Sequence, residues 1–216
     1  MAQVLAGFDE NGAVRRFDAD GDLSQGTKID DAYFINFSRL LAKDEIKKGS
    51  FTLTLMVSES YAHPLPAGET VNLVDLSGSN GYKINSPAGE YGILYATGSA
   101  LAAAAIDNEG YVQAGLLYYQ AGIAVITSSI FKQSLTTAVE FDSDAQDVAA
   151  ALSGTAISGN CDDFRHRISN VSFNNTVELN STIYFCRVNN TDFNYTSNPT
   201  YLSSSKIVVK NNATDL

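Results

Sequence analysis

The chain of 216 residues has no tryptophan, two cysteines, two histidines and four prolines. It contains no Cys-x-x-Cys pair, which leaves a zinc site without support. The first ten residues lack the basic and apolar blocks of a signal peptide. A reducing compartment is therefore expected, and Cys161 and Cys186 are interpreted as buried thiols, with a disulfide between them as the alternative.

Positive charge is also scarce. Fourteen Lys and Arg face 24 Asp and Glu, which gives a net charge of −10 and a pI near 4.5. Between Lys83 and Arg165 the only basic residue is Lys132. A nucleic-acid-binding protein needs a basic patch, and none is visible, so no nucleic-acid partner is expected.

The groups that carry enzyme chemistry are few. The sequence has no P-loop, no Gly-x-Ser-x-Gly elbow and no His-Glu-x-x-His motif. His63 and His166 are interpreted as structural or surface residues, because no motif places a nucleophile beside either one. No catalytic residue and no cofactor is expected. Two acidic pairs are interpreted as solvated surface groups rather than glycosidase carboxylates: Glu140 with Asp142, and Asp162 with Asp163.

One acidic loop resembles the start of a calcium site. Asp18, Asp20 and Asp22 stand at positions one, three and five of such a loop, but position six is Leu23 and position twelve is Ile29. The loop is therefore only a weak calcium candidate. The alternative is an Asp/Gly turn in which the carboxylates cap backbone amides.

Periodicity predicts a mainly β fold with a minor α+β character: an antiparallel β sandwich or barrel-like domain with one N-terminal amphipathic helix near 31–48. The helix is expected because Tyr33, Phe34, Phe37, Leu40 and Leu41 recur at spacings of three and four. Phe37 and Leu41 are expected among the most buried residues. The predicted strands are Phe51–Val57, Val71–Leu76, Tyr91–Ala96, Tyr111–Tyr119 and Ile123–Thr127.

The uncharged stretch Gly110–Phe131 is long enough to span a bilayer. Its glutamines and glycines favour two strands that join near Gln120–Gly122 instead. Residues 1–165 are expected to form a β-rich domain. Residues 166–216 form an Asn/Thr/Ser-rich β segment, either part of that domain or an assembly arm.

Residues 168–202 have the alternating pattern of a strand with one apolar face and one amide- and hydroxyl-rich face. Amides lose less than charges when they leave water, so this face suits a contact between subunits. The candidate interface residues are Asn174, Asn180, Asn189, Asn194, Tyr195 and Tyr201.

Three segments carry a family resemblance: 36–51 (NFSRLLAKDEIKKGSF), 115–127 (GLLYYQAGIAVIT), and 173–187 with 192–201 (FNNTVELNSTIYFCR and DFNYTSNPTY). Together they resemble virion structural proteins of tailed bacteriophages, especially contractile-tailed marine and cyanobacterial phages. The resemblance implies a non-enzymatic virion component in the tail, baseplate or neck. It implies assembly in the bacterial cytoplasm, other virion subunits as partners and a homo-oligomeric arrangement.

Two alternatives remain open at this point. The first is a surface module of the virion that binds host glycan through exposed aromatic and amide groups, for which Tyr195, Asn198 and Tyr201 are candidates. The second is a tail-associated glycosidase, whose activity would depend on Glu140 or Asp142.

Overall fold

The computed structural model of the chain describes residues 1–22, 26, 28–38, 42–56, 70–78, 80–98, 111–132, 157–177 and 179–187. The chain divides into two compact units, Met1–Glu178 and Leu179–Leu216. Among the described helices, none has the length and apolar character needed to cross a membrane.

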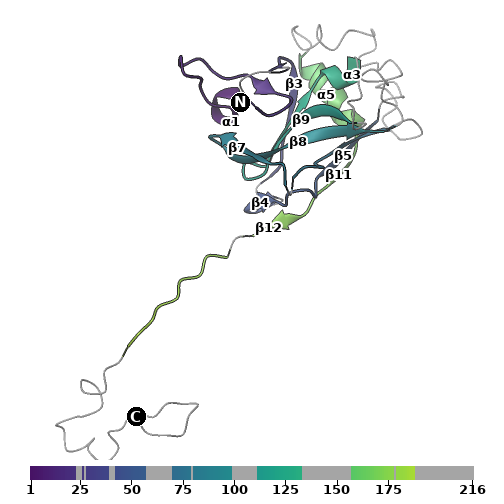
Figure 1. The fold of residues 1–216 in the computed structure, drawn as a ribbon. Coiled ribbons are helices and arrows are strands. Elements are labelled where there is room, and N and C mark those ends of the chain that lie inside the picture. The colour runs from purple at the N-terminus through teal and green to yellow at the C-terminus, as the bar shows by residue number, and fades with distance from the viewer. Residues whose placement is uncertain are drawn as a thin grey trace, which may run out of the picture. The chain divides into compact units, whose positions relative to one another are not determined.

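The first unit consists mainly of strands (Figure 1). Its described strands are β1 (Phe17–Asp18), β2 (Lys28–Ile29), β3 (Ala32–Asn36), β4 (Glu45–Ile46), β5 (Thr52–Met56), β6 (Thr70–Val74), β7 (Lys83–Ser86), β8 (Gly89–Thr97), β9 (Val112–Tyr118), β10 (Ile123–Thr127), β11 (Ile168–Ser172) and β12 (Asn175–Thr176). The described helices are α1 (Ala2–Leu5), α3 (Ser129–Lys132) and α5 (Ile157–Arg167).

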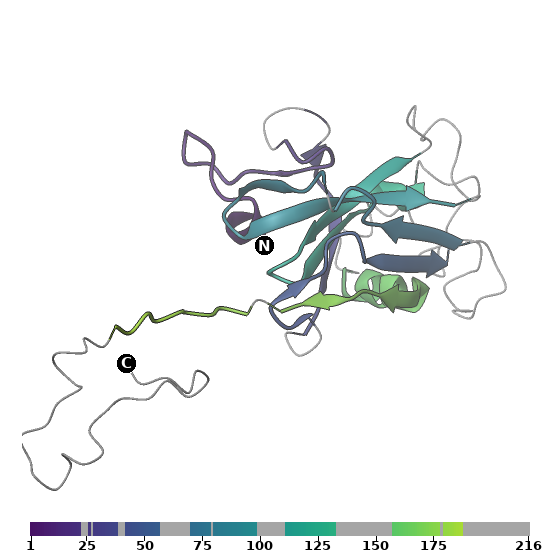
Figure 2. The same cartoon turned by 60° about the horizontal axis from the view of Figure 1, so that its bottom comes forward.

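One antiparallel sheet dominates this unit. Its described strands follow the order β11-β5-β6-β8-β9-β10-β3, and β7 pairs with β8 beside this path. The sheet curls into a half-barrel, as the two views in Figures 1 and 2 show. Two small sheets, β1-β2 and β12-β4, and an isolated antiparallel bridge between Phe8 and Val14 accompany it. The prediction of a mainly β, antiparallel, barrel-like domain is confirmed.

The sheet buries side chains on both of its faces. Adjacent residues of β9 point to opposite sides, so that Leu117 packs into one core and Leu116 into the other. The first core also receives Phe131 from α3 and Phe164 from α5. The second receives Leu5 from α1. Strands buried on both faces read as continuous apolar runs, which explains the uncharged stretch around residues 112–127.

The prediction of two strands within Gly110–Phe131 is confirmed. β9 and β10 pair antiparallel with Ile123 opposite Tyr118. The connection closes with a hydrogen bond from the Gly122 N–H to the Tyr118 carbonyl at 2.9 Å. Gly122 has φ = +65°, a backbone conformation that residues with a Cβ avoid.

The predicted helix near 31–48 is wrong over most of its described part, because Ala32–Asn36 is strand β3 and Glu45–Ile46 is strand β4. Ala42 is the one described residue of that range in helical conformation, and its N–H donates to the Ser38 carbonyl at 3.0 Å. Tyr33 packs on the first core, while Ala32 packs on the second. A short strand with apolar residues on both faces also produces spacings of three and four, so periodicity did not separate the two structures. The only described helix near the N-terminus is the single turn α1.

The predicted burial of Phe37 is also wrong. Its side chain is half-buried and contacts Phe51 and Phe173 at ring distances of 5.6 and 5.2 Å. Phe37 lies just beyond the end of β3, at the border of the first core, whereas Phe51 is fully buried. Leu41 lies outside the described residues.

The stretch that follows α5 forms two short strands rather than one. β11 pairs with β5, and β12 pairs with β4. Between them, Asn174 contacts the turn before β5: its N–H donates to Ser50 Oγ, and its carbonyl accepts from the Lys47 N–H at 2.8 Å. Residues 168–176 therefore belong to the first unit.

The second unit is described over Leu179–Arg187. These nine residues form no helix or strand, and all of them are exposed. Four of them are large and apolar, namely Leu179, Ile183, Tyr184 and Phe185.

Candidate functional site

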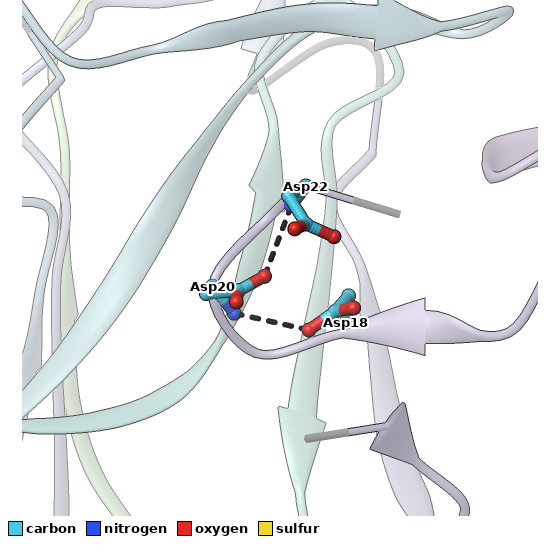
Figure 3. Close-up of side chains that lie close together, drawn as sticks. All are labelled: Asp18, Asp20 and Asp22. Carbon is cyan, nitrogen blue, oxygen red and sulfur yellow. Dashed lines mark hydrogen bonds between the residues drawn. The ribbon is translucent and has the colours of Figure 1, made fainter. Parts of the chain in front are cut away.

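The acidic loop brings three carboxylates together at the end of β1. One oxygen from each of Asp18, Asp20 and Asp22 lies within 4.8 Å of the others (Figure 3). Asp18 Oδ1 accepts from the Asp20 N–H at 3.3 Å, and Asp20 Oδ1 accepts from the Asp22 N–H at 3.0 Å. These bonds are those of successive Asx turns, in which a carboxylate caps the amide two residues later.

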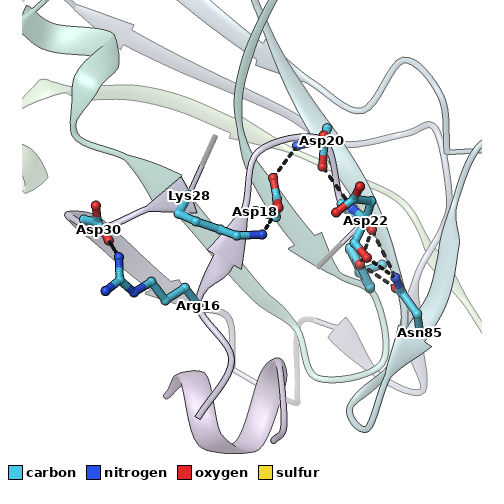
Figure 4. Close-up of polar contacts among 9 residues, drawn as sticks. Arg16, Asp18, Asp20, Asp22, Lys28, Asp30 and Asn85 are labelled. Carbon is cyan, nitrogen blue, oxygen red and sulfur yellow. Dashed lines mark hydrogen bonds and ion pairs between the residues drawn. The ribbon is translucent and has the colours of Figure 1, made fainter. Parts of the chain in front are cut away.

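Asp18 is the buried member of this cluster. Its side chain is fully covered, and the Lys28 ammonium forms an ion pair with Oδ2 (Figure 4). Burial raises the pKa of the Asp18 carboxyl, and the nearby Asp20 carboxyl adds to the increase, while the Lys28 ammonium opposes it. The charge that a cation would neutralise at Asp18 is therefore already neutralised by Lys28.

The loop is held from its other side by Asn85 and Tyr91. Asn85 Nδ2 donates to the Gly21 carbonyl at 3.2 Å, and the Tyr91 hydroxyl lies 2.8 Å from the same oxygen. Ile29, at the twelfth position of the calcium-loop pattern, is buried and pairs with Phe17. An apolar side chain in a core offers no ligand atom, so the contacts present in the loop are those of the Asp/Gly turn.

A second polar cluster surrounds Asp75, and no sequence motif pointed to it. Asp75 is 1% exposed and lies just after β6. Its Oδ2 accepts from the Gly49 N–H and from the Tyr119 hydroxyl, each at 2.8 Å, and the carboxyl also accepts from the Gly78 backbone. One carboxylate thus joins the turn before β5, the loop after β6 and the end of β9.

The environment of Asp75 fits an anchor better than a catalytic group. Burial raises the pKa of its carboxyl, and the three donors oppose that rise. Burial and the Asp75 charge raise the pKa of the Tyr119 hydroxyl. A cation lies close by, since Lys48 Nζ is 5.8 Å from the centre of the Tyr119 ring and is ion-paired with Glu90. Among the described residues, the side chain of Asp75 is almost fully covered.

The described histidine and cysteines lie on or near the surface. His166 is half-buried on α5, with Nε2 3.9 Å from Asp162 Oδ2. The prediction of buried thiols is wrong, because Cys161 and Cys186 are both free and exposed. Helix α5 contacts the core through Phe164, one turn beyond Cys161, and Cys186 belongs to the exposed stretch Leu179–Arg187. His63, Glu140 and Asp142 lie outside the described residues.

The predicted interface residues fall into two groups. The side chains of Asn174 and Asn180 are exposed, the first in the link between β11 and β12 and the second in the second unit. The other four lie outside the described residues: Asn189, Asn194, Tyr195 and Tyr201.

The two outermost strands of the large sheet are β3 and β11. Neither contains a charged residue or a proline. Monomeric proteins commonly protect such edges with lysines, prolines or a covering loop, because an outer strand offers unpaired N–H and carbonyl groups to another chain. Within the described ranges, no strand pairs with the outer side of either one. These two edges are the candidate sites of contact with other chains.

Comparison with known proteins adds no relative: no family model, no curated protein and no solved structure matches the chain.

Proposed function

We propose that this chain is a non-enzymatic structural component of a bacteriophage virion, in the tail, baseplate or neck. The proposal is supported by the resemblance of segments 36–51, 115–127, and 173–187 with 192–201 to virion proteins of tailed phages. The partners are other virion subunits, including further copies of this chain. Its place of action is the particle, which is assembled in the cytoplasm of the bacterial host.

The observation that carries the proposal is the combination of two uncharged outer strands with an exposed apolar segment. β3 and β11 have none of the charged or proline residues that keep strand edges apart. In the second unit, Leu179 is 92% exposed and Phe185 is 94% exposed. Apolar groups left in water favour association by about 25 cal/mol per Å² that becomes buried. A chain with these features is suited to contacts with neighbouring subunits.

The contact between subunits is proposed to include residues 168–202. Each amide that finds a partner there contributes about 1 kcal/mol, and a series of such bonds fixes the register between subunits. The alternative is an ordinary hydrated surface. A protein with both Asn180→Lys and Asn189→Lys separates the two, because a buried unpaired ammonium is costly at a contact, whereas a hydrated surface changes by less than about 0.5 kcal/mol per site.

A matched control for this pair is Asn80→Lys, at an exposed turn position in the first unit. The double variant should fold like wild type and fail to enter particles, while the control should enter them normally. If the double variant enters particles at the wild-type level, residues 180 and 189 are not part of the contact.

The direct test of the function is quantitative mass spectrometry of purified phage particles from a host infected with the phage that encodes this chain. The protein is expected in washed particles at a fixed stoichiometry relative to the other structural proteins. Its loss on washing, or its presence in the infected cell alone, would contradict a structural role.

The alternative of a host-glycan-binding module depends on Tyr195, Asn198 and Tyr201. All three lie outside the described residues, so no contact in the structure favours it over assembly. A glycan array with the purified protein tests it directly.

A further inference from the structure

Every second residue of β3 directs its backbone groups away from the sheet. The Phe37 N–H donates to the Gly122 carbonyl at 2.8 Å, and the Asp31 carbonyl accepts from the Ser128 N–H at 3.0 Å. The odd-numbered residues therefore face β10. Because alternate residues of an antiparallel strand bond opposite neighbours, the even-numbered ones point outward. Three residues offer their N–H and carbonyl groups on that side: Ala32, Phe34 and Asn36.

Two of these residues, Ala32 and Phe34, border a hollow with an apolar part and a charged part, the latter formed by Arg15, Arg16, Asp30 and Asp31. A cavity of about 460 Å³ lies beside this edge, with Met1, Phe17, Ile29 and Phe34 among its lining residues. Phe34 is 42% exposed, although its ring lies 5.7 Å from that of the buried Phe17. The edge therefore offers backbone hydrogen-bonding groups next to an incompletely covered apolar surface.

The exposed segment of the second unit has the complementary pattern. From Leu179 to Phe185 the odd-numbered residues are Leu, Ser, Ile and Phe, and the even-numbered ones are Asn, Thr and Tyr. In an extended chain, Ile183 and Phe185 share one face and Thr182 lies on the other. Such a segment can bury its apolar face only against another surface.

We propose that Leu179–Phe185 of one copy adds as an antiparallel strand to the outer edge of β3 in a second copy. Ile183 would pair with Phe34, Phe185 with Ala32, and Ser181 with Asn36. Since directly opposite residues share a face, this register places Ile183 and Phe185 over the hollow. The inference deepens the proposed virion role and rests on it for its setting, because it names which surface of a neighbouring copy receives the segment.

Charge favours the antiparallel direction. Asp30 and Asp31 precede β3, and Arg187 follows the segment. In the antiparallel arrangement the segment runs toward the start of β3, so Arg187 arrives beside Asp30 and Asp31, which line the hollow with Arg15 and Arg16. Asp30 is ion-paired with Arg16 at 3.0 Å, so Asp31 is the carboxylate that Arg187 would meet without displacing that pair. In a parallel arrangement Arg187 would lie at the far end of β3, where Asn36 and Phe37 carry no charge. The segment is also long enough, because its seven residues in extended conformation can cover the five residues of β3.

A disulfide between two differently labelled proteins tests the register. One protein carries Asn36→Cys and the other Ser181→Cys, both in a background with Cys161→Ser and Cys186→Ser. Asn36 and Ser181 are exposed, so neither change disturbs a core. In the proposed register their Cα atoms stand about 5.5 Å apart, within the range that a disulfide bridges. Because the thiols start on different chains, only contact between copies produces the mixed dimer.

The register control replaces Ser181→Cys by Asn180→Cys. This shift of one residue moves the thiol to the opposite face of the added strand. The 36–181 mixture should give a mixed dimer on a non-reducing gel, severalfold more than the 36–180 mixture. Equal yields from the two mixtures, or no mixed dimer from either, would overturn the proposal.

A second variant tests the apolar contact. Ile183→Asp in the Ser181→Cys protein should abolish the cross-link, since it places a carboxylate over the hollow. Thr182→Asp, on the face that only further subunits of a particle would cover, serves as the matched control and in purified protein should retain most of the cross-link. If Ile183→Asp cross-links as well as its control, the segment does not use the β3 hollow.

The outcomes for the particle and for the strand are separable. Cross-linking in purified protein, combined with absence of the chain from particles, would leave the strand addition standing and refute the virion role. Presence in particles without the 36–181 cross-link, in particles or in solution, would refute the strand addition alone.

Discussion

Replacing Asp75 with alanine is the most informative single change in the first unit. The carboxylate is 1% exposed and accepts hydrogen bonds from Gly49, Gly78 and Tyr119. Asp75→Ala leaves three donors without that acceptor. A buried donor without a partner costs about 1–3 kcal/mol, while loss of a buried charge returns part of this. The free energy of unfolding should therefore fall by about 2–4 kcal/mol.

Asp75→Asn is the matched control. The amide oxygen can keep the bonds from Gly49 and Tyr119, and the NH2 group takes the place of Oδ1, which has no hydrogen-bond partner among the described residues. Because the NH2 brings buried donors without an acceptor, the expected loss is about 1–2 kcal/mol at neutral pH, smaller than that of Asp75→Ala. Urea unfolding followed by far-UV circular dichroism measures both variants, since the chain has no tryptophan to report by fluorescence.

The pH dependence of stability, compared between wild type and Asp75→Asn, gives the direction of the pKa shift of the Asp75 carboxyl. Burial raises the pKa of Asp75 in the folded protein above its ordinary value of 3.8, so the folded state binds the proton more tightly than the unfolded chain does. The stability of wild type relative to Asp75→Asn should be greatest below pH 3.8 and decline as the pH rises through the folded pKa. Asp75→Asn as damaging as Asp75→Ala, or a relative stability that increases with pH, would refute the reasoning.

Three further changes test other parts of the fold by the same unfolding assay. Phe51→Ala should cost about 3–5 kcal/mol because Phe51 is fully buried, and half-buried Phe37→Ala should cost clearly less; equal losses would contradict the burial. Gly122→Ala should cost about 1–2 kcal/mol because of the positive φ, and Gly122→Asn should be better tolerated. Lys28→Met should cost on the order of 2 kcal/mol, because it leaves the buried Asp18 carboxylate unpaired, and the loss should shrink at acidic pH; a constant loss would exclude the ion pair as its cause.

The β strands were predictable where the apolar runs were long. β9 and β10 stand out because an uncharged run broken at Gln120–Gly122 fits a pair of strands better than one helix. β5 could be predicted because polar and apolar residues alternate in it, with Leu53 and Leu55 on the same face. In each case the local pattern and the tertiary structure favour the same element.

The segment at β3 could not be predicted from its own residues. Tyr33, Phe34 and Phe37 satisfy helical spacing, and only the pairing with β10 and the two cores on either side of the sheet decide in favour of a strand. Helix α5 was missed for the opposite reason. Its sequence is polar, and few of its described side chains, Phe164 among them, contact the core, so no apolar stripe marks it.

The two polar clusters also differ in how far they could be predicted from the sequence. The Asp18–Asp22 loop was visible because its carboxylates are close in sequence, and its turn hydrogen bonds follow from that spacing. The Asp75 anchor joins residues 26 and 44 positions away along the chain. A single aspartate after a strand carries no sequence signal of such partners. The outward-facing groups of β3 also depend on register, which the sequence of β3 alone does not fix.

Cryo-electron microscopy of the intact phage particle tests the central claim most directly. We expect density for the curled sheet of Met1–Glu178 at a defined position in the tail, baseplate or neck, with an additional strand from a neighbouring copy along β3. A complete particle structure with no density for this sheet at any position would contradict the account.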